Sequence, residues 1–139
     1  MIDINKLSSL IAEDEGFRGR LYKDCKGFNT IGFGFNVDKN DLPKDIAILW
    51  LNKLIKGLEK DFFVNLSLWN TLNDARKYVL INMAYHIGIH GVFKFKEMML
   101  ALEVADYEQA AKEMKNSEWY VEFTSRASRL VNIMISGEF

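Results

Sequence analysis

Two groups of acidic residues near the N-terminus have the types and spacing that acid–base chemistry needs. Glu13, Asp14 and Glu15 stand directly before Gly16, and Asp24 follows nine residues after Glu15. Glycoside hydrolysis uses two carboxyl groups, one to protonate the leaving oxygen and one to stabilise the sugar cation or activate water. The plainer alternatives are a solvated helix end for the triplet and a turn aspartate that caps a local N–H for Asp24.

The acidic triplet lies at the end of a predicted helix over residues 5–14. Leu7, Leu10 and Ile11 recur there at helical spacing, and Gly16 supplies the left-handed cap that often ends a helix. The helix dipole is negative at this end and disfavours an ionised carboxylate. A carboxyl group here is therefore suited to hold its proton until a leaving oxygen takes it.

Residues 21–37 predict a β-hairpin that faces this helix across a cleft. Large apolar residues alternate with small or polar ones, which predicts one apolar face made of Ile31, Phe33, Phe35 and Val37. Thr30 lies on the small face. Its hydroxyl either holds a water molecule or belongs to an ordinary strand residue.

The rest of the chain has helical periodicity. One long helix is expected over about residues 42–64, with Asp41 or Asp45 as its cap. Further helices are expected over about 73–87, from near Gly91, after Asp106 with Gln109 in a capping box, and after Thr124.

These elements predict an α+β, mainly α fold in one domain, with two lobes. A small β-hairpin lobe over about 16–41 is joined by the long helix to a helical lobe over about 65–139, which also holds the N-terminal helix. The length of 139 residues and 49% hydrophobic content fit one domain with its own core.

Charge and cysteine content narrow the classes of function. A net charge of -1 gives no reason to expect nucleic-acid binding, although the basic stretch from Arg18 to Lys26 either favours an anionic polymer or is a solvated face. Cys25 is the only cysteine and is expected to be a bystander beside Asp24. The N-terminus lacks the features of a signal peptide, and no segment is apolar enough to span a membrane, so synthesis in a cytoplasm without stable membrane association is expected.

The segment EDEGFRGRLYKDCKGFNTIGFGF resembles, without a gap, the active-site segment of the phage-type lysozymes or endolysins, glycoside hydrolase family 24. In that family the glutamate before the glycine is the general acid, the aspartate of YKD is the second carboxylate, and the threonine of TIG helps to place the attacking water. The resemblance therefore assigns these roles to Glu15, Asp24 and Thr30. It selects Glu15 from the acidic triplet, which periodicity alone does not do.

Two further segments extend the resemblance to about residues 5–139. INMAYHIGIHGVFKF resembles the family's core helix and turn, and SEWYVEFTSRASRLV resembles its WY…RAxR segment. In the family the arginine that matches Arg126 lies beside the acid, which implies that Arg126 modulates Glu15. Tyr85 and His86 are candidates for sugar binding from the cleft wall, with ordinary interlobe packing as the alternative.

The resemblance implies a monomeric muramidase. Its substrate would be the glycan strands of peptidoglycan, whose β-1,4 bond between N-acetylmuramic acid and N-acetylglucosamine would be hydrolysed with inversion, without cofactor or metal. Release through a holin-type pore would allow action on the wall in the periplasm and cell lysis. The alternatives are a lytic transglycosylase and a non-catalytic peptidoglycan-binding protein on the same fold.

Some features depart from the family or point elsewhere. The short segment after the hairpin predicts that a third strand is missing, and Phe35 replaces a histidine that is frequent in the family. His86 and His90 have the spacing of a metal pair, but Gly88 is expected to break the helix between them, which disfavours a zinc site. The three tryptophans, Trp50, Trp69 and Trp119, are either a carbohydrate platform or core residues.

Overall fold

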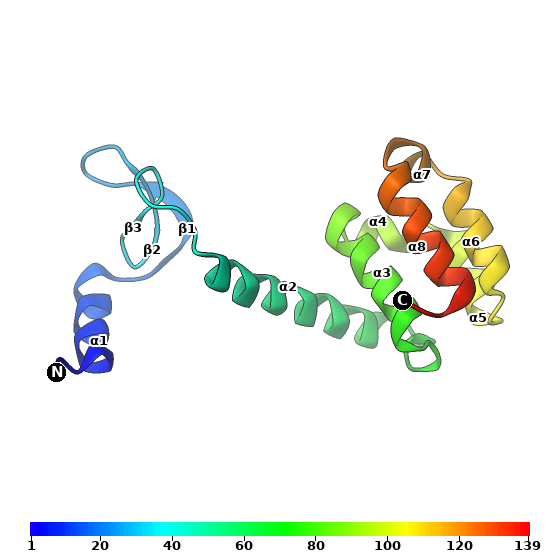
Figure 1. The fold of residues 1–139 in the computed structure, drawn as a ribbon, viewed down its shortest axis with the longest axis horizontal. Coiled ribbons are helices and arrows are strands. Elements are labelled where there is room, and N and C mark those ends of the chain that lie inside the picture. The colour runs from blue at the N-terminus through cyan, green and yellow to red at the C-terminus, as the bar shows by residue number, and fades with distance from the viewer. The chain divides into compact units, whose positions relative to one another are not determined.

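A computed structural model describes all 139 residues and divides them into two compact units, residues 1–49 (unit 1) and 50–139 (unit 2). Each unit is described by itself. Unit 1 contains α1 (Ile4–Glu15), β1 (Arg18–Lys23), β2 (Asn29–Gly32), β3 (Phe35–Asn36) and the start of α2 (Lys44–Asn65) (Figure 1). Unit 2 contains the rest of α2, the 3-10 turn η1 (Trp69–Thr71), α3 (Asp74–Ile87), α4 (Ile89–Phe93), α5 (Lys96–Glu103), α6 (Tyr107–Lys115), α7 (Glu118–Glu122) and α8 (Thr124–Ser136). The chain is mainly α with a small antiparallel sheet, as predicted.

The sheet has three strands in the order β1-β2-β3, so the expectation that a third strand is missing was wrong. The second strand does not run on through Val37 either. Gly32 and Gly34 have φ of +68° and +75°, a region that interrupts extended backbone, so the chain reverses around Phe33. Ile31 then pairs with Phe35, and the predicted apolar face from Ile31 to Val37 is divided between two strands.

The ends of α1 are set by polar groups. The carboxylate of Asp3 accepts a hydrogen bond from the backbone N–H of Lys6 at 3.0 Å, which caps the first turn. At the other end, the N–H of Gly16 donates to the carbonyl of Ala12, and Gly16 has a φ of +68°. The helix therefore ends where the glycine was expected to end it, and Glu15 is its last residue.

The long helix α2 begins at Lys44, directly after Pro43, and extends one residue beyond the predicted end. The carbonyl of Pro43 accepts the first helical hydrogen bond, from the N–H of Ala47. Asp45 lies within the first turn and is therefore not the N-cap, although its charge is favourable beside the positive end of the helix.

The caps of α3 and α6 explain why the sequence predicted these two helices. The side chains of Asn73 and Asp106 each accept from the N–H three residues ahead, and Gly88 ends α3 with a φ of +81°. Only half of the predicted capping box at α6 forms, because the Gln109 side chain donates to Glu113 at 2.8 Å instead of turning back to the cap. The helix expected from near Gly91 is α4, which begins two residues earlier.

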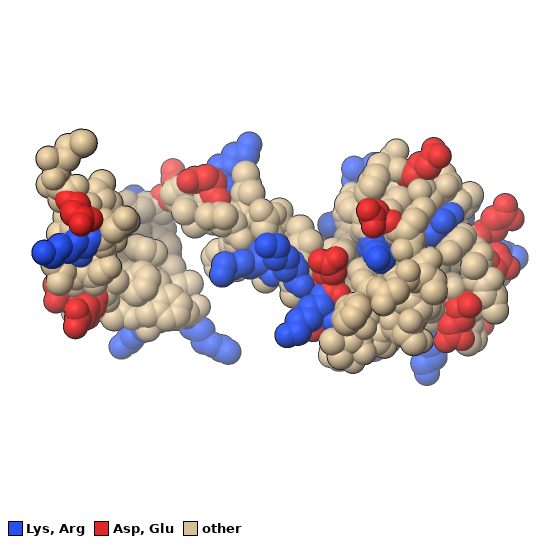
Figure 2. All heavy atoms as spheres, turned by 90° about the horizontal axis from the view of Figure 1, so that it is seen from below, with Lys and Arg blue, Asp and Glu red and all other residues tan.

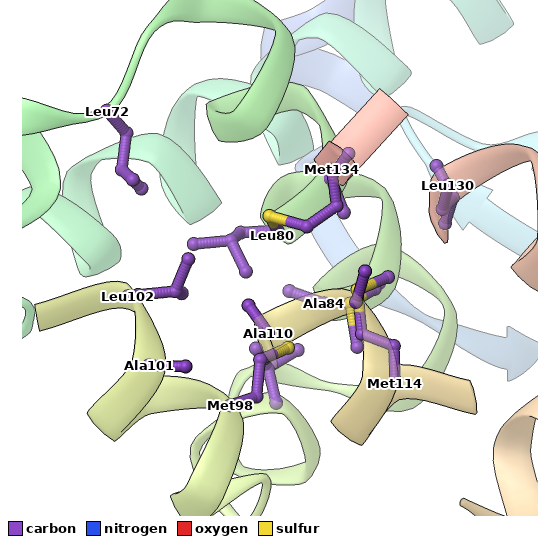
Figure 3. Packing of buried hydrophobic residues seen from close by; sticks show 14 of the residues in the cluster. Leu72, Leu80, Ala84, Met98, Ala101, Leu102, Ala110, Met114, Leu130 and Met134 are labelled. Carbon is purple, nitrogen blue, oxygen red and sulfur yellow. The ribbon is translucent and has the colours of Figure 1, made fainter. Parts of the chain in front are cut away.

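The apolar core belongs entirely to unit 2. Figure 3 shows methionine and leucine side chains from several helices meeting in one cluster, and all buried apolar residues of the chain lie between Phe62 and Met134. The last carbonyls of α8 are tied to the start of α3, because the Arg76 guanidinium donates to the carbonyl oxygens of Met134 and Ile135 at 2.9 and 3.1 Å. The core therefore encloses the segment in which the second and third sequence resemblances lie.

The charged groups are mixed in sign. In the face shown in Figure 2, Lys and Arg side chains are interspersed with Asp and Glu, in line with the net charge of -1. None of the helices combines the length and apolar character that a bilayer span needs.

Candidate active site

Glu15 is positioned by the end of α1 and by a glycine of the sheet. Its side chain is exposed, and its carboxylate lies against Gly34 in the turn between β2 and β3. The Oε2 atom is 2.7 Å from the point that a Cβ atom on Gly34 would occupy. The helix end and the sheet therefore meet at the carboxyl group to which the sequence assigns the proton donor.

Asp24 lies in the turn that follows β1, and one of its carboxylate oxygens organises that turn. Oδ1 accepts hydrogen bonds from the backbone N–H groups of Lys26 and Phe28, both at 2.9 Å. The capping role considered for a turn aspartate is thus real. Oδ2 accepts no hydrogen bond from the chain and is left to act on a substrate or water, so the structural and chemical roles use different oxygens.

The carbonyl of Phe28 connects Asp24 to Thr30. It accepts the backbone N–H of Asp24 at 3.0 Å and the Thr30 hydroxyl at 2.9 Å. Thr30 is 3% exposed and is the only buried residue of unit 1. Because its proton is committed to this carbonyl, its hydroxyl oxygen can only accept a hydrogen bond from another group, such as a water molecule.

A second carboxylate, that of Asp38, closes the sheet beside Thr30. Its two oxygens accept from the backbone N–H and the side-chain amide of Asn29, at 2.7 and 2.9 Å. These two donors, the backbone one first, lower the pKa of Asp38 below its usual value of 3.8. The end of β3 is thereby fastened to the start of β2.

Unit 1 thus places all three sequence-predicted catalytic residues on one small scaffold. Asp24 and Thr30 share the Phe28 carbonyl, and Glu15 lies against the turn four residues beyond Thr30. The arrangement offers a carboxyl group for proton donation, a free carboxylate oxygen and a hydroxyl acceptor. These are the groups that glycoside hydrolysis needs.

Arg126 in unit 2 is held by Asn82. Its Nε donates to the Asn82 side-chain oxygen at 2.8 Å, and the Asn82 amide donates to the Tyr78 hydroxyl at 3.0 Å. Together with Tyr85, these residues line a groove of about 510 Å³ between α2, α3 and α8. The modulation of Glu15 by Arg126 stays a prediction.

His86 is tied into the framework of unit 2. Its Nδ1 atom accepts the indole N–H of Trp119 at 3.1 Å, and its ring lies edge-on to Phe123 with centroids 4.3 Å apart. Tyr85 is half exposed and borders the groove. Sugar binding by Tyr85 and His86 stays a prediction, with only the Nε2 side of His86 left for it.

The remaining sequence candidates have separate places. Trp69 and Trp119 are buried in the core, whereas Trp50 is exposed, so the three tryptophans form no common platform. Gly88 separates His86 in α3 from His90 in α4, as expected. Cys25 is exposed in the Asp24 turn.

Two residues of the site were not assigned a role from the sequence. Phe28 contributes through its backbone carbonyl, which any residue type carries, so its type gave no signal. Gly34 contributes through an absent side chain. The small residues of the sequence IGFGF were a signal for close approach, but they pointed to a ligand and not to Glu15.

Comparison with known proteins gives the family. The phage lysozyme family matches residues 12–132. The chain belongs to the phage lysozyme family. It is 26% identical to probable T4-type lysozyme 1 and 27% identical to probable T4-type lysozyme 2 of Dictyostelium discoideum, over 96% of this chain and 96% of each relative.

A third relative is much larger. The pre-baseplate central spike protein Gp5 of Enterobacteria phage T4 is 27% identical over 94% of this chain, which spans 28% of that protein's length. The family confirms the resemblance drawn from the sequence motifs and supports a lysozyme-like function on peptidoglycan. It includes the matched ranges of both units, since residues 12–132 contain the sheet and nearly all of the core.

Proposed function

We propose that this phage lysozyme family member is a muramidase that hydrolyses the β-1,4 bond between N-acetylmuramic acid and N-acetylglucosamine. Glu15 protonates the glycosidic oxygen, and Asp24 stabilises the developing sugar cation or acts as base. Thr30 accepts a hydrogen bond from the attacking water. The observation that carries this proposal is the division of Asp24, whose Oδ1 holds the turn while Oδ2 is free.

The roles agree with the donors and acceptors that each residue has left. Thr30 has spent its only proton on the Phe28 carbonyl, so a water bound to it must donate and thereby turns a lone pair elsewhere. A water oriented in this way, near a carboxylate that takes its second proton, is the nucleophile of an inverting reaction. Inversion is therefore the stereochemistry that we propose.

The cellular role follows from the substrate. Hydrolysis of the glycan strands weakens the wall and lyses the cell, and the enzyme acts as a monomer without a cofactor. For a protein made in the cytoplasm, the periplasmic face of the wall is reached through a holin-type pore. Tyr85 and His86 contribute to sugar binding and Arg126 modulates the acid.

The test is digestion of purified Gram-negative peptidoglycan by the full chain, with Glu15→Gln and Glu13→Gln as matched variants. Wild type and Glu13→Gln release reducing ends, whereas Glu15→Gln is slower by at least about 10²-fold because it lacks the proton donor. Equal loss in both variants, or activity in Glu15→Gln, would reassign the acid.

The mass of the released fragments distinguishes the alternative chemistry. Hydrolysis adds the elements of one water molecule to each cleaved bond, whereas a lytic transglycosylase leaves an internal anhydro ring and adds none. Products that carry the added water support the proposal. Binding to peptidoglycan without any released fragment would indicate the non-catalytic alternative.

A further inference from the structure

Gly34 is the residue of the sheet that has no room for a side chain because Glu15 fills the space. A Cβ atom at position 34 would lie 2.7 Å from Glu15 Oε2, 3.1 Å from its Cδ and 3.6 Å from its Cγ. Contacts below about 3.0 Å are not tolerated, so either the carboxylate or the turn would have to move. The φ of +75° adds a second preference for glycine.

The turn that carries Gly34 is fixed on both sides. Ile31 pairs with Phe35 and Thr30 pairs with Asn36, so the three residues between them form a short connection. The side chain of Asn36 accepts from the N–H groups of Asp38 and Lys39, both at 3.0 Å, and holds the exit of β3. The bare backbone at Gly34 is therefore a defined surface against which the Glu15 carboxylate rests.

We propose that Gly34 is a positioning residue for the catalytic acid: its missing side chain sets where the Glu15 carboxyl group lies. The inference rests on the proposed function, in which Glu15 is the proton donor. Displacement of a reacting group by about 1 Å costs on the order of 10²-fold in rate, so the space at Gly34 is a catalytic requirement.

The cost of filling that space falls on the position of Glu15 more than on folding. Glu15 is exposed, and the atoms in conflict are the far end of a flexible side chain. A methyl group at position 34 therefore moves the carboxylate and leaves the strands paired. A residue with a purely structural role would lower stability first.

Gly32 is a matched control within the same turn. Its φ of +68° is close to that of Gly34, and a Cβ there would lie 2.9 Å from two ring carbons of Phe35, itself an exposed side chain. Gly32→Ala therefore carries a similar backbone strain and a similar clash. It differs in that the displaced group is an aromatic ring and not Glu15.

The experiment compares Gly34→Ala with Gly32→Ala in the full chain, using soluble peptidoglycan fragments and thermal unfolding. We expect Gly34→Ala to lower kcat about 10²-fold while KM changes by less than about threefold, since binding groups stay in place. Gly32→Ala keeps kcat within about threefold of wild type. The two variants have similar Tm values.

Gly34→Asn and Gly32→Asn provide a second pair, because asparagine tolerates positive φ better than alanine but still carries a Cβ atom. A folded Gly34→Asn or Gly34→Ala with wild-type kcat overturns the inference. Unfolding of both position-34 variants while both position-32 variants fold also overturns it, because Gly34 would then serve the fold. Glu15→Gln separates the levels: if it retains activity, the proposed function fails, whereas an inactive Glu15→Gln with an active Gly34→Ala contradicts only this inference.

Discussion

Residues 1–49 contain a single buried side chain, that of Thr30, whereas residues 50–139 contain every buried apolar residue of the chain. The first unit carries all three candidate catalytic groups. Its internal order comes from hydrogen bonds, with Asp24, Asn36 and Asp38 each accepting from two donors. The second unit is ordered by the packing of methionine, leucine, valine and alanine side chains in one cluster.

The difference separates what places the chemistry from what supplies the apolar core. Short polar side chains in turns fix nearby backbone groups to within hydrogen-bond distance, which suits a site that must stay open to a polymer. Burial of apolar groups supplies stability in proportion to area and is indifferent to chemistry. Substitutions in unit 1 should therefore change rate, and substitutions in the core of unit 2 should change stability.

The largest expected stability effect comes from Met83, which lies in α3 and is fully buried. Met83→Ala leaves a cavity and should lower the free energy of unfolding by about 2–5 kcal/mol, measured by denaturant titration. Leu100→Ala, at a 55% exposed site, is the control and should change it by less than about 0.5 kcal/mol. Wild-type stability in Met83→Ala would contradict the place of the core.

Arg126→Ala should change the pH dependence of the rate. The resemblance assigns Arg126 to modulating the acid, and a positive charge favours the ionised form. Its removal should keep the acid protonated to higher pH and move the alkaline limb of the kcat/KM profile upward. Arg129→Ala, on the exposed side of α8, is the control, and a limb that stays in place in a folded Arg126→Ala contradicts the role.

Asp38→Asn should have the smallest effect, confined to acid. The Asn29 donors lower the pKa of Asp38 in the folded state, so its contribution is full above the usual value of 3.8 and is lost as pH falls through the lower folded value. Wild-type Tm should therefore decrease below about pH 4 more steeply than that of Asp38→Asn. Asp41→Asn, at an exposed aspartate without a hydrogen bond, should keep the wild-type slope.

Much of the fold could be predicted because its signals are local. Asn73, Gly88 and Asp106 act on backbone groups within a few residues, and the bounds of α3 and α6 followed from them. The three-stranded sheet was missed because alternation continues through the turn, and only the positive φ of Gly32 and Gly34 breaks the strand. Short α5 and α7 were not predicted, since one or two turns give little periodicity.

The catalytic candidates came from motif spacing, but their arrangement depends on contacts that the sequence does not encode locally. Asp24 and Thr30 are joined through the Phe28 carbonyl, a group common to every residue. Glu15 and Gly34 are nineteen positions apart and meet only because α1 and the sheet come together. Such contacts follow from the fold of the whole unit.

The most direct test measures rate and stability together in Glu15→Gln. The side chain is exposed and the substitution keeps its shape, so Tm should stay within about 2 °C of wild type, as for other surface substitutions. The rate of reducing-end release from peptidoglycan should fall by at least about 10²-fold. A folded Glu15→Gln that retains more than about a tenth of the wild-type rate would contradict the assignment of Glu15 as the acid.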